Sequence, residues 1–358
     1  MLQLHSSWAR ASLVRIPQRS SCFFHGHWNF FDPCGYLVQL IIKTRRKVPD
    51  FMMGSYTIKS HGGRVARTHK FDWLVLLILV VIDLFLDSLE PFHRFVGEGM
   101  MTDFKYPYKD ETIPFRIVQI VAILFPIAFF FMFYIRNRNV YDLHHSILGI
   151  LFSGLITAVI TDLIKLAVGR PRPNFFWRCF PDGKAVFDAI TNDVVCHGDE
   201  KIIKEGYKSF PSGHTSWAFA GFSFFAWYLS GKIQVFDRRG HIGKLCLVLL
   251  PLLLAAFVAV SRVDDYRHHW QDVFAGGLLG ITVSSTCYLL LFPLPHQSGW
   301  APHAYFEMLG RTEGSSTEDC LPMLQPQLKS ANASSSEDLN VRIELLEAGR
   351  RFEKGKMG

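Results

Sequence analysis

FRIVQIVAILFPIAFFFMFYI, residues 115–135, is an almost uninterrupted apolar stretch in which Arg116 is the one charged side chain before the closing Arg136. A bilayer core about 30 Å thick is crossed by roughly 20 helical residues at a rise of 1.5 Å each. The stretch has this length, and it therefore predicts a membrane-spanning helix.

Further apolar runs lie on both sides of this stretch. They are residues 73–89, 146–168, 217–229, 245–261 and 273–292. The run 217–229 is short, and the run 73–89 contains Asp83 and Asp87, which are costly at membrane depth unless they face the bundle interior or water. We expect an all-α fold, a bundle of six transmembrane helices with a long extracytosolic loop between the third and the fourth.

The composition supports a membrane protein. Hydrophobic residues make up 49% of the 358, charged residues 19%, and the mean hydropathy is +0.17. These values exclude an intrinsically disordered, collagen-like or coiled-coil protein. The net charge of +7 is modest and comes with no RNA-binding or zinc-finger motif, so we expect no nucleic-acid partner.

Basic residues suggest how the helices are oriented and where the domain ends. They cluster before the first run and after the second and fourth, which places these connections in the cytosol by the positive-inside rule. We predict a largely disordered cytosolic tail at 1–70, a six-span domain at 71–295 and a second such tail at 296–358. Residues 1–50 contain few acids and also resemble a transit peptide, an alternative that stays open.

Polar segments interrupt the apolar chain at three places. They are KLAVGRPRP at 165–173, PSGH at 211–214 and SRVDDYRHHWQD at 261–272. Each lies at the end or the start of an expected span. Because successive spans alternate in direction, all three segments are expected at one face of the membrane, the extracytosolic one.

Five residues in these segments suit an anion. Lys165, Arg172 and Arg262 are cations, and guanidinium groups match phosphate oxygens with two parallel hydrogen bonds. Ser212 and Gly213 lie where a helix begins, so backbone N–H groups and the positive end of the helix dipole face the same space. A tetrahedral oxyanion is the expected ligand.

Two histidines and one carboxylate in these segments could act as a nucleophile, a general acid and an orienting group. His268 and Asp272 are four residues apart and would share one helix face. A carboxylate that accepts from one imidazole nitrogen leaves the other nitrogen free to attack. His214 is then available as the general acid, since an imidazole can protonate a leaving alkoxide near neutral pH.

The order and spacing of these residues resemble the three-part signature of the type 2 phosphatidic acid phosphatases, also called lipid phosphate phosphatases. Segments such as YDLHHSILG, NFFWRCFPDG and SFPSGHTSWAFAG are similar to the plant branch of that family, and the resemblance covers about residues 56–309. Arg267 is a departure, because the plant sequences have an aromatic residue there.

The resemblance implies roles for each residue. His268 would attack phosphorus, Asp272 would orient it and His214 would protonate the leaving oxygen. The phosphoryl oxygens would be held by Lys165, Arg172, Ser212, Gly213 and Arg262. No metal or other cofactor would be required.

The expected substrate is the phospholipid phosphatidate, reached from the lipid bilayer. Diacylglycerol pyrophosphate and other lipid phosphates would suit the same site. The plasma membrane and the endoplasmic reticulum are both compatible with an active site on the extracytosolic face, and the oligomeric state is left open.

Two cysteines and two pairs of histidines raise the questions of a disulfide and of a zinc site. Cys179 and Cys196 share the long extracytosolic loop, where an oxidising compartment permits a disulfide, and we expect one. The pairs His144–His145 and His268–His269 suggest zinc, but their spacings match no common zinc motif. For His144 and His145 an interfacial or packing role is preferred.

Two other functions share parts of this pattern. A vanadium-dependent haloperoxidase holds vanadate in a similar cradle, but six spans are better explained by a lipid substrate. A membrane transporter or an inactive scaffold of the same fold is the second alternative. Asp83, Asp87 and Asp162 would suit an ion path, yet the nucleophile, acid and cradle would then have no purpose.

Overall fold

The computed structural model describes residues 56–236, 241–296 and 301–307, and nearly all regular structure there is helical. The elements are η3 (Ile58–Gly62), α2 (Gly63–Thr68), α3 (Lys70–Ser88), η4 (Glu98–Phe104), α4 (Phe115–Asn137), α5 (Val140–Val168), α6 (Phe175–Cys179), α7 (Glu200–Gly206), α8 (Gly213–Lys232), α9 (Ile242–Asp264) and α10 (Trp270–Leu291). Isolated β-bridges replace strands in the described residues. The predicted all-α class is confirmed.

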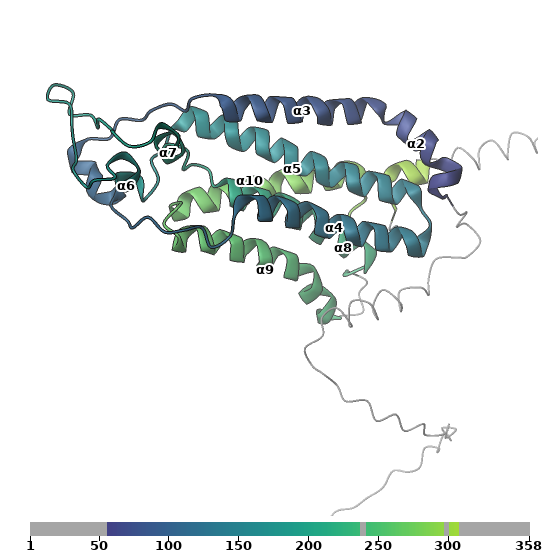
Figure 1. The fold of residues 1–358 in the computed structure, drawn as a ribbon. Helices are drawn as coiled ribbons and strands as arrows, with labels where there is room; N and C mark the ends of the chain where they lie inside the picture. The colour runs from purple at the N-terminus through teal and green to yellow at the C-terminus, as the bar shows by residue number, and fades with distance from the viewer. Residues whose placement is uncertain (1–55, 237–240, 297–300, 308–358) are drawn as a thin grey trace, which may run out of the picture. The chain divides into compact units, whose positions relative to one another are not determined.

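The long helices of the described chain coincide with the apolar runs of the sequence, and Figure 1 shows them packed lengthwise. Four of them, α4, α5, α9 and α10, are long and apolar enough to cross a membrane. Neither α3 nor α8 meets both conditions, because α3 carries several charges and α8 is rich in small and polar residues.

The helix α8 lies at the centre of the bundle, in contact with α4, α5, α9 and α10. Nearly all of its side chains are buried, including Ser216, Ser223 and Ser230. A helix surrounded by other helices does not face lipid, so it can tolerate small and polar side chains that a lipid-facing helix could not. This position explains why α8 is the least hydrophobic of the long helices.

Glycines in α10 allow it to approach α8 at backbone distance. A Cβ atom added to Gly276 would lie 2.6 Å from the carbonyl oxygen of Ser212, and one added to Gly280 would lie 2.5 Å from that of Ser216. Both distances are too short for any side chain. These glycines therefore allow the start of α10 to pack closely against the start of α8, as small residues commonly do in helical membrane proteins.

The helix α3 packs on α5 and is otherwise largely exposed. Leu77 is 61% exposed and Leu84 67%, whereas Leu76 and Leu86 are buried. An exposed apolar surface of this kind is costly in water and favourable in lipid.

Described residues lie on both sides of the predicted boundaries 70/71 and 295/296. Residues 58–68 are helical, and Val65 packs with Val140, Tyr141 and Tyr305 in one buried cluster. The described parts of the two predicted tails are thus held on the bundle by apolar contact. Residues 1–55 and 308–358, where disorder or a transit peptide was expected, lie outside the described residues.

The connection between α3 and α4 and the connection between α5 and α8 pack together into a small folded unit with a shared core. The first contributes Val96, Met101 and Phe104, and the second contributes Phe175, Phe176, Phe180 and Tyr207. Cys179 and Cys196 are joined by a disulfide within it. The unit therefore presents fixed side chains to the adjacent end of the bundle.

Candidate active site

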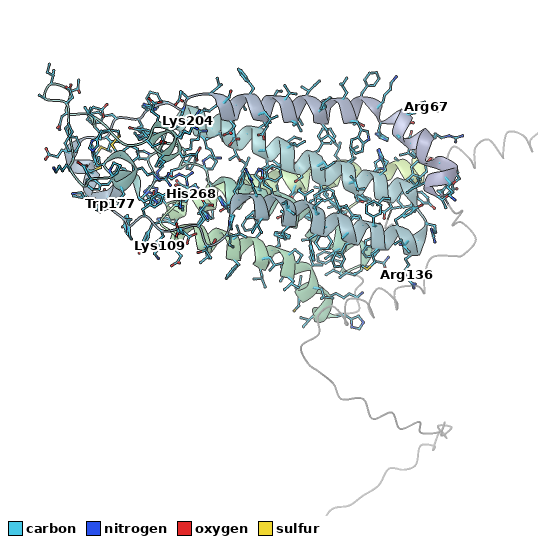
Figure 2. All side chains as sticks on the ribbon, viewed as in Figure 1. Arg67, Lys109, Arg136, Trp177, Lys204 and His268 are labelled. Atoms are coloured by element: carbon cyan, nitrogen blue, oxygen red, sulfur yellow. A yellow bond between two sulfur atoms is a disulfide. The ribbon has the colours of Figure 1, made fainter. Side chains whose placement is uncertain are left out.

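The three polar segments of the sequence meet at one end of the bundle. The end of α5, the start of α8, the end of α9 and the start of α10 converge there, at the end where Figure 2 labels His268 and Lys109. Arg67 and Arg136 are labelled at the opposite end. The backbone N–H of Ser212 donates to the carbonyl of Asp272 at 2.9 Å, which ties α8 directly to α10.

The imidazole of His268 is buried, with 3% of the residue exposed, just before α10. Its Nδ1 lies 2.7 Å from the carbonyl oxygen of Ser209, which can only accept, so Nδ1 carries the proton. Nε2 therefore holds the lone pair. Burial lowers the pKa of His268 to about 3, and the opposing effect of Asp272 is smaller, so the ring is neutral near pH 7.

The carboxylate of Asp272 is fully buried and has several partners. Arg170 Nη1 donates to Oδ1 at 2.6 Å, and Ser209 Oγ donates to Oδ2 at 2.6 Å. The backbone N–H of His269 donates to Oδ2 at 3.0 Å. Nδ1 of His268 lies 3.8 Å from Oδ2, beyond hydrogen-bonding distance.

Ser209 therefore links the two groups that the sequence paired directly. Its carbonyl holds His268 and its hydroxyl holds Asp272. Sequence reasoning missed Ser209 and Arg170, since neither belongs to the spaced signature and their contacts arise from segments more than 60 residues away. Their only sequence signal was position, since Arg170 lies within KLAVGRPRP and Ser209 lies two residues before PSGH.

His214 is the second residue of α8, and one of its ring nitrogens is unsatisfied. Nε2 is buried without a hydrogen-bond partner among the described residues, and the nearest carboxylate oxygen, Glu111 Oε2, is 3.9 Å away. The ring packs against Phe115 at 4.9 Å between centroids. A buried polar atom without a partner is uncommon and indicates a place for a ligand atom.

Arg172 is the cation contributed by the connection after α5. Its Nε donates to the carbonyl of Glu205 at 2.8 Å, and its Nη2 donates to the carboxylate of Glu205 at 3.3 Å. Burial raises the pKa of Glu205, but Arg172 and Lys208 outweigh it and the pKa is lowered overall. Burial lowers the pKa of Arg172. An arginine remains charged at neutral pH in such a setting.

Arg262 is completely buried at the end of α9. Its guanidinium lies 3.4 Å from Asp265 and 3.4 Å from Glu111, while its Nε has no partner among the described residues. Sequence analysis did not single out Glu111, which comes from the connection before α4. Its carboxylate stands among Arg262, His214 and Arg267, where an anion would bind.

Arg267, the departure from the plant pattern, anchors that same connection. Its Nη2 donates to the carbonyl of Lys109 at 2.9 Å, its guanidinium stacks on Tyr108 at 4.8 Å, and Nη1 lies 3.8 Å from Glu111. The residue thus adds a positive charge next to the cradle while its flat group packs on an aromatic ring.

Lys165 reaches from α5 to the start of α8. Its Nζ donates to Asp162 at 2.8 Å. A Cβ atom on Gly213 would lie 2.9 Å from the same Nζ, so the glycine lets the ammonium lie close to the α8 backbone. The first N–H groups of α8 have no acceptor within the helix and point to the same region.

The predicted site residues are thus gathered at one end of the bundle. Those that the contacts above connect are Lys165, Ser212, Gly213, His214, Arg262, His268 and Asp272, and Arg172 is near enough to act electrostatically on His214 and His268. A neutral imidazole with a free Nε2, a second histidine with an unsatisfied nitrogen, and fixed cations together suit nucleophilic attack on a phosphoryl group. The fold and these residues define a helical protein with apolar spans and, at one end, a candidate site of buried histidines and cations.

Comparison with known proteins places the chain in a family of this kind. The PAP2 superfamily matches residues 146–294. The chain is 60% identical over 263 residues to lipid phosphate phosphatase 2 of Arabidopsis thaliana, covering 73% of this chain and 91% of the relative. It is 58% identical to lipid phosphate phosphatase 1 of the same plant, covering 74% and 80%. This chain belongs to the PAP2 superfamily.

More distant relatives extend the comparison beyond plants. The chain is 32% identical to a Schizosaccharomyces pombe protein named "Probable diacylglycerol pyrophosphate phosphatase 1", covering 62% of this chain and 81% of that one. No solved structure matches the chain.

Proposed function

We propose that this protein is a lipid phosphate phosphatase that converts phosphatidate to diacylglycerol and phosphate. The observation that carries the proposal is the buried His268, whose Nδ1 is held by Ser209 and whose free Nε2 belongs to the same cluster as three fixed cations. The PAP2 superfamily match and the lipid phosphate phosphatase relatives support the same substrate class.

In the first step, Nε2 of His268 attacks phosphorus and the bond from phosphorus to the glycerol oxygen breaks. The leaving oxygen takes a proton from Nε2 of protonated His214, an atom with no other partner among the described residues, and His214 becomes neutral. The charge that builds up on the phosphoryl oxygens is stabilised by Lys165, Arg172 and Arg262 and by the first N–H groups of α8. The products are diacylglycerol and a phosphohistidine.

In the second step, a water molecule attacks the phosphohistidine. His214, now neutral, takes a proton from that water, and the bond between Nε2 and phosphorus breaks. Phosphate leaves, and both histidines return to their starting states. Ser209 and Asp272 act as positioning residues throughout, because neither touches the phosphoryl group in this scheme.

The reaction is proposed to proceed without Mg²⁺. Divalent ions in phosphoryl transfer neutralise charge on the phosphoryl oxygens, and here fixed cations stand in that role. The nearby carboxylates are already committed to cations, Asp162 to Lys165, Glu205 to Arg172 and Asp272 to Arg170. Such pairs are poor candidates for Mg²⁺, which favours free carboxylate and water oxygens.

The proposed membrane arrangement has six spans, with α3 and α8 added to the four helices that qualify by composition alone. The burial of α8 among its neighbours and the exposed leucines of α3 support this count. The catalytic end then faces the extracytosolic side, in the plasma membrane or the endoplasmic reticulum. The apolar spans would give a two-tailed lipid lateral access.

Phosphatidate is the proposed substrate through the family resemblance, and a cradle that would contact only the phosphoryl group leaves related lipid phosphates open. Diacylglycerol pyrophosphate presents the same terminal group, and the name of the fission yeast relative favours testing it. Other lipid phosphates would be distinguished by their tails and leaving groups.

The test measures phosphate release from phosphatidate in detergent micelles with excess EDTA. We expect robust release by the native protein and a loss of at least about a thousandfold in His268→Ala, because the nucleophile is gone. His197→Ala, an exposed histidine of the long connection, serves as the matched control and should retain the native rate.

Equal rates in His268→Ala and the native protein would refute the histidine mechanism. Absence of release from phosphatidate and from diacylglycerol pyrophosphate alike would refute the phosphatase and favour a transporter or an inactive scaffold. In that case Asp83→Asn, in α3, would be assayed for lost ion flux.

A further inference from the structure

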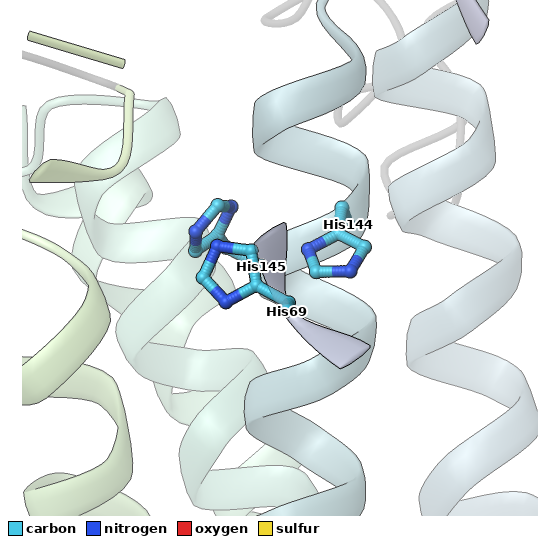
Figure 3. A group of neighbouring side chains, drawn as sticks. All are labelled: His69, His144 and His145. Carbon is cyan, nitrogen blue, oxygen red and sulfur yellow. The ribbon is translucent and has the colours of Figure 1, made fainter. Parts of the chain in front are cut away.

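Three histidines gather at the end of the bundle opposite to the catalytic residues. They are His69, at the junction of α2 and α3, and His144 and His145, near the start of α5. Each offers a ring nitrogen, and these nitrogens all lie within 4.8 Å of one another. Figure 3 shows the three rings drawn together from two separate segments.

The position separates this cluster from the phosphoryl site. Both sites use α5, but Lys165 follows His145 by some 20 residues, which is roughly 30 Å along a helix. The cluster therefore has no contact with the reacting groups. It joins the start of α3 to the start of α5.

Hydrogen bonds at Nδ1 determine which ring nitrogen carries the proton in His69 and His145. Nδ1 of His69 lies 2.7 Å from Asp72 Oδ2, and Nδ1 of His145 lies 2.7 Å from the carbonyl oxygen of Tyr141. Both oxygens accept, so each Nδ1 donates a proton and each Nε2 keeps its lone pair. Metal-bound histidines are held in the same way, by a carboxylate or a carbonyl on the nitrogen that faces away from the metal.

His144 supplies the third lone pair. The indole N–H of Trp73, which can only donate, lies 3.1 Å from its Nε2. Nε2 of His144 is therefore unprotonated as well. Its Nδ1 carries the proton and is buried without a hydrogen-bond partner among the described residues.

We propose that His69, His144 and His145 bind a Zn²⁺ ion that fastens α3 to α5. Three neutral imidazoles and a water molecule would make a four-coordinate site, and imidazole is a preferred zinc ligand. The ion replaces the indole proton at His144 Nε2. Asp72 offsets part of the ion's charge through His69.

The geometry requires only small movements. Zinc-to-nitrogen distances are about 2.0–2.1 Å, so tetrahedral ligand nitrogens are about 3.4 Å apart. One ring nitrogen from each histidine lies within 4.8 Å of the others, and side-chain rotation that turns His144 Nε2 from Trp73 to the ion would close that spacing. No zinc motif is visible in the sequence, because His69 and His144 lie 75 positions apart and meet only through the packing of α3 on α5.

The test uses the full-length protein in detergent, with any polyhistidine tag removed and bound metal stripped by a chelator. Zinc binding is then measured by equilibrium dialysis. We expect one zinc ion per chain in the native protein and a loss of affinity of more than about 100-fold in His69→Gln. His303→Gln, at an exposed histidine outside the cluster, should bind zinc like the native protein.

Asp72→Asn provides the sharper variant, because it leaves all three ligands in place. It should weaken zinc binding about 10- to 100-fold by loosening His69. X-ray absorption of the zinc-loaded native protein should show imidazole nitrogens at about 2.0–2.1 Å. Zinc should also raise the Tm of the native protein but not that of His69→Gln, while the two have the same Tm in EDTA.

Several outcomes would overturn the proposal. They are absence of stoichiometric zinc in the native protein, or affinity in His69→Gln and Asp72→Asn equal to that in His303→Gln. If His69→Gln fails to fold, Asp72→Asn and the absorption spectrum decide alone. The result is independent of the phosphatase proposal, since metal-free protein should still release phosphate.

Discussion

Two buried charged clusters, one at each end of the bundle, differ in how completely their polar atoms are paired. At the end away from the catalytic residues, Lys232 Nζ lies 2.5 Å from Asp142 Oδ1, and Tyr228 donates to Asp142 Oδ2 at 3.0 Å. At the catalytic end, His214 Nε2 and the Nε atoms of Arg262 and Arg267 have no partner among the described residues.

The difference separates a structural role from a functional one. Asp142 has a partner for each carboxylate oxygen, so the cluster fixes α5 against α8 and has little left to offer a ligand. The catalytic cluster holds its cations in place through carboxylates and keeps some donors unused. Unsatisfied buried groups cost stability, and a bound phosphoryl group would satisfy them.

Removing the proposed acid should have the largest effect. His214→Asn should lower the rate of phosphate release from phosphatidate about 10²- to 10⁴-fold, the usual contribution of general acid catalysis. With an aryl phosphate, whose phenolate leaves more easily, the loss should be smaller. An equal loss on both substrates would show that His214 binds phosphate instead of protonating the leaving group.

Breaking the paired cluster should affect stability instead of chemistry. Asp142→Asn leaves the ammonium of Lys232 without its carboxylate, and removing one partner of a buried ion pair costs about 3–5 kcal/mol. Thermal unfolding in detergent would measure a lower Tm, with phosphate release per folded molecule retained at low temperature. A normal Tm together with lost activity would reverse the roles assigned to the two clusters.

The protonation of His268 at acid pH provides a third test. Burial lowers the pKa of His268 to about 3, so its neutral form persists as the pH falls from 7 to 4 and is lost only near pH 3. An imidazole with the usual pKa of about 6.5 would be about 3% neutral at pH 5, roughly thirtyfold less. NMR of histidine-labelled protein, assigned with His268→Gln, tests this. A resonance of His268 that titrates near pH 6.5 would contradict the burial argument.

The smallest expected effect concerns Glu111, whose carboxylate lies among the cations of the catalytic cluster. A phosphoryl group must compete with it. Glu111→Gln should lower the KM for phosphatidate a few fold, as expected when one exposed ion-pair partner becomes neutral. Asp110→Asn, at the exposed neighbouring residue, is the control. A raised KM would show that Glu111 holds the site together.

Much of this architecture was predictable from the sequence, because helix length and apolar composition are local properties. The expected runs coincide with the long helices, and the family signature named residues that come together at one end. The catalytic roles of His268, His214 and Asp272 are still predictions. Membrane hydropathy was least informative for α8, whose burial depends on neighbours far away in the sequence.

The parts that could not be predicted arise from contacts between connections. Ser209, Arg170 and Glu111 belong to loops, and only the folded chain brings them to His268, Asp272 and Arg262. The same is true of His69, which reaches His144 through the packing of α3 on α5. Spacing along the chain indicates partners on one helix but gives no information about such pairs.

The central claim is that His268 carries the phosphoryl group during the reaction. The most direct test is to mix the protein with phosphatidate labelled with ³²P in its phosphate, stop the reaction within milliseconds in alkali, and map the labelled peptide. We expect alkali-stable, acid-labile label on the peptide that contains His268 in the native protein and none in His268→Ala. Label at another residue, or label that persists in His268→Ala, would contradict the account.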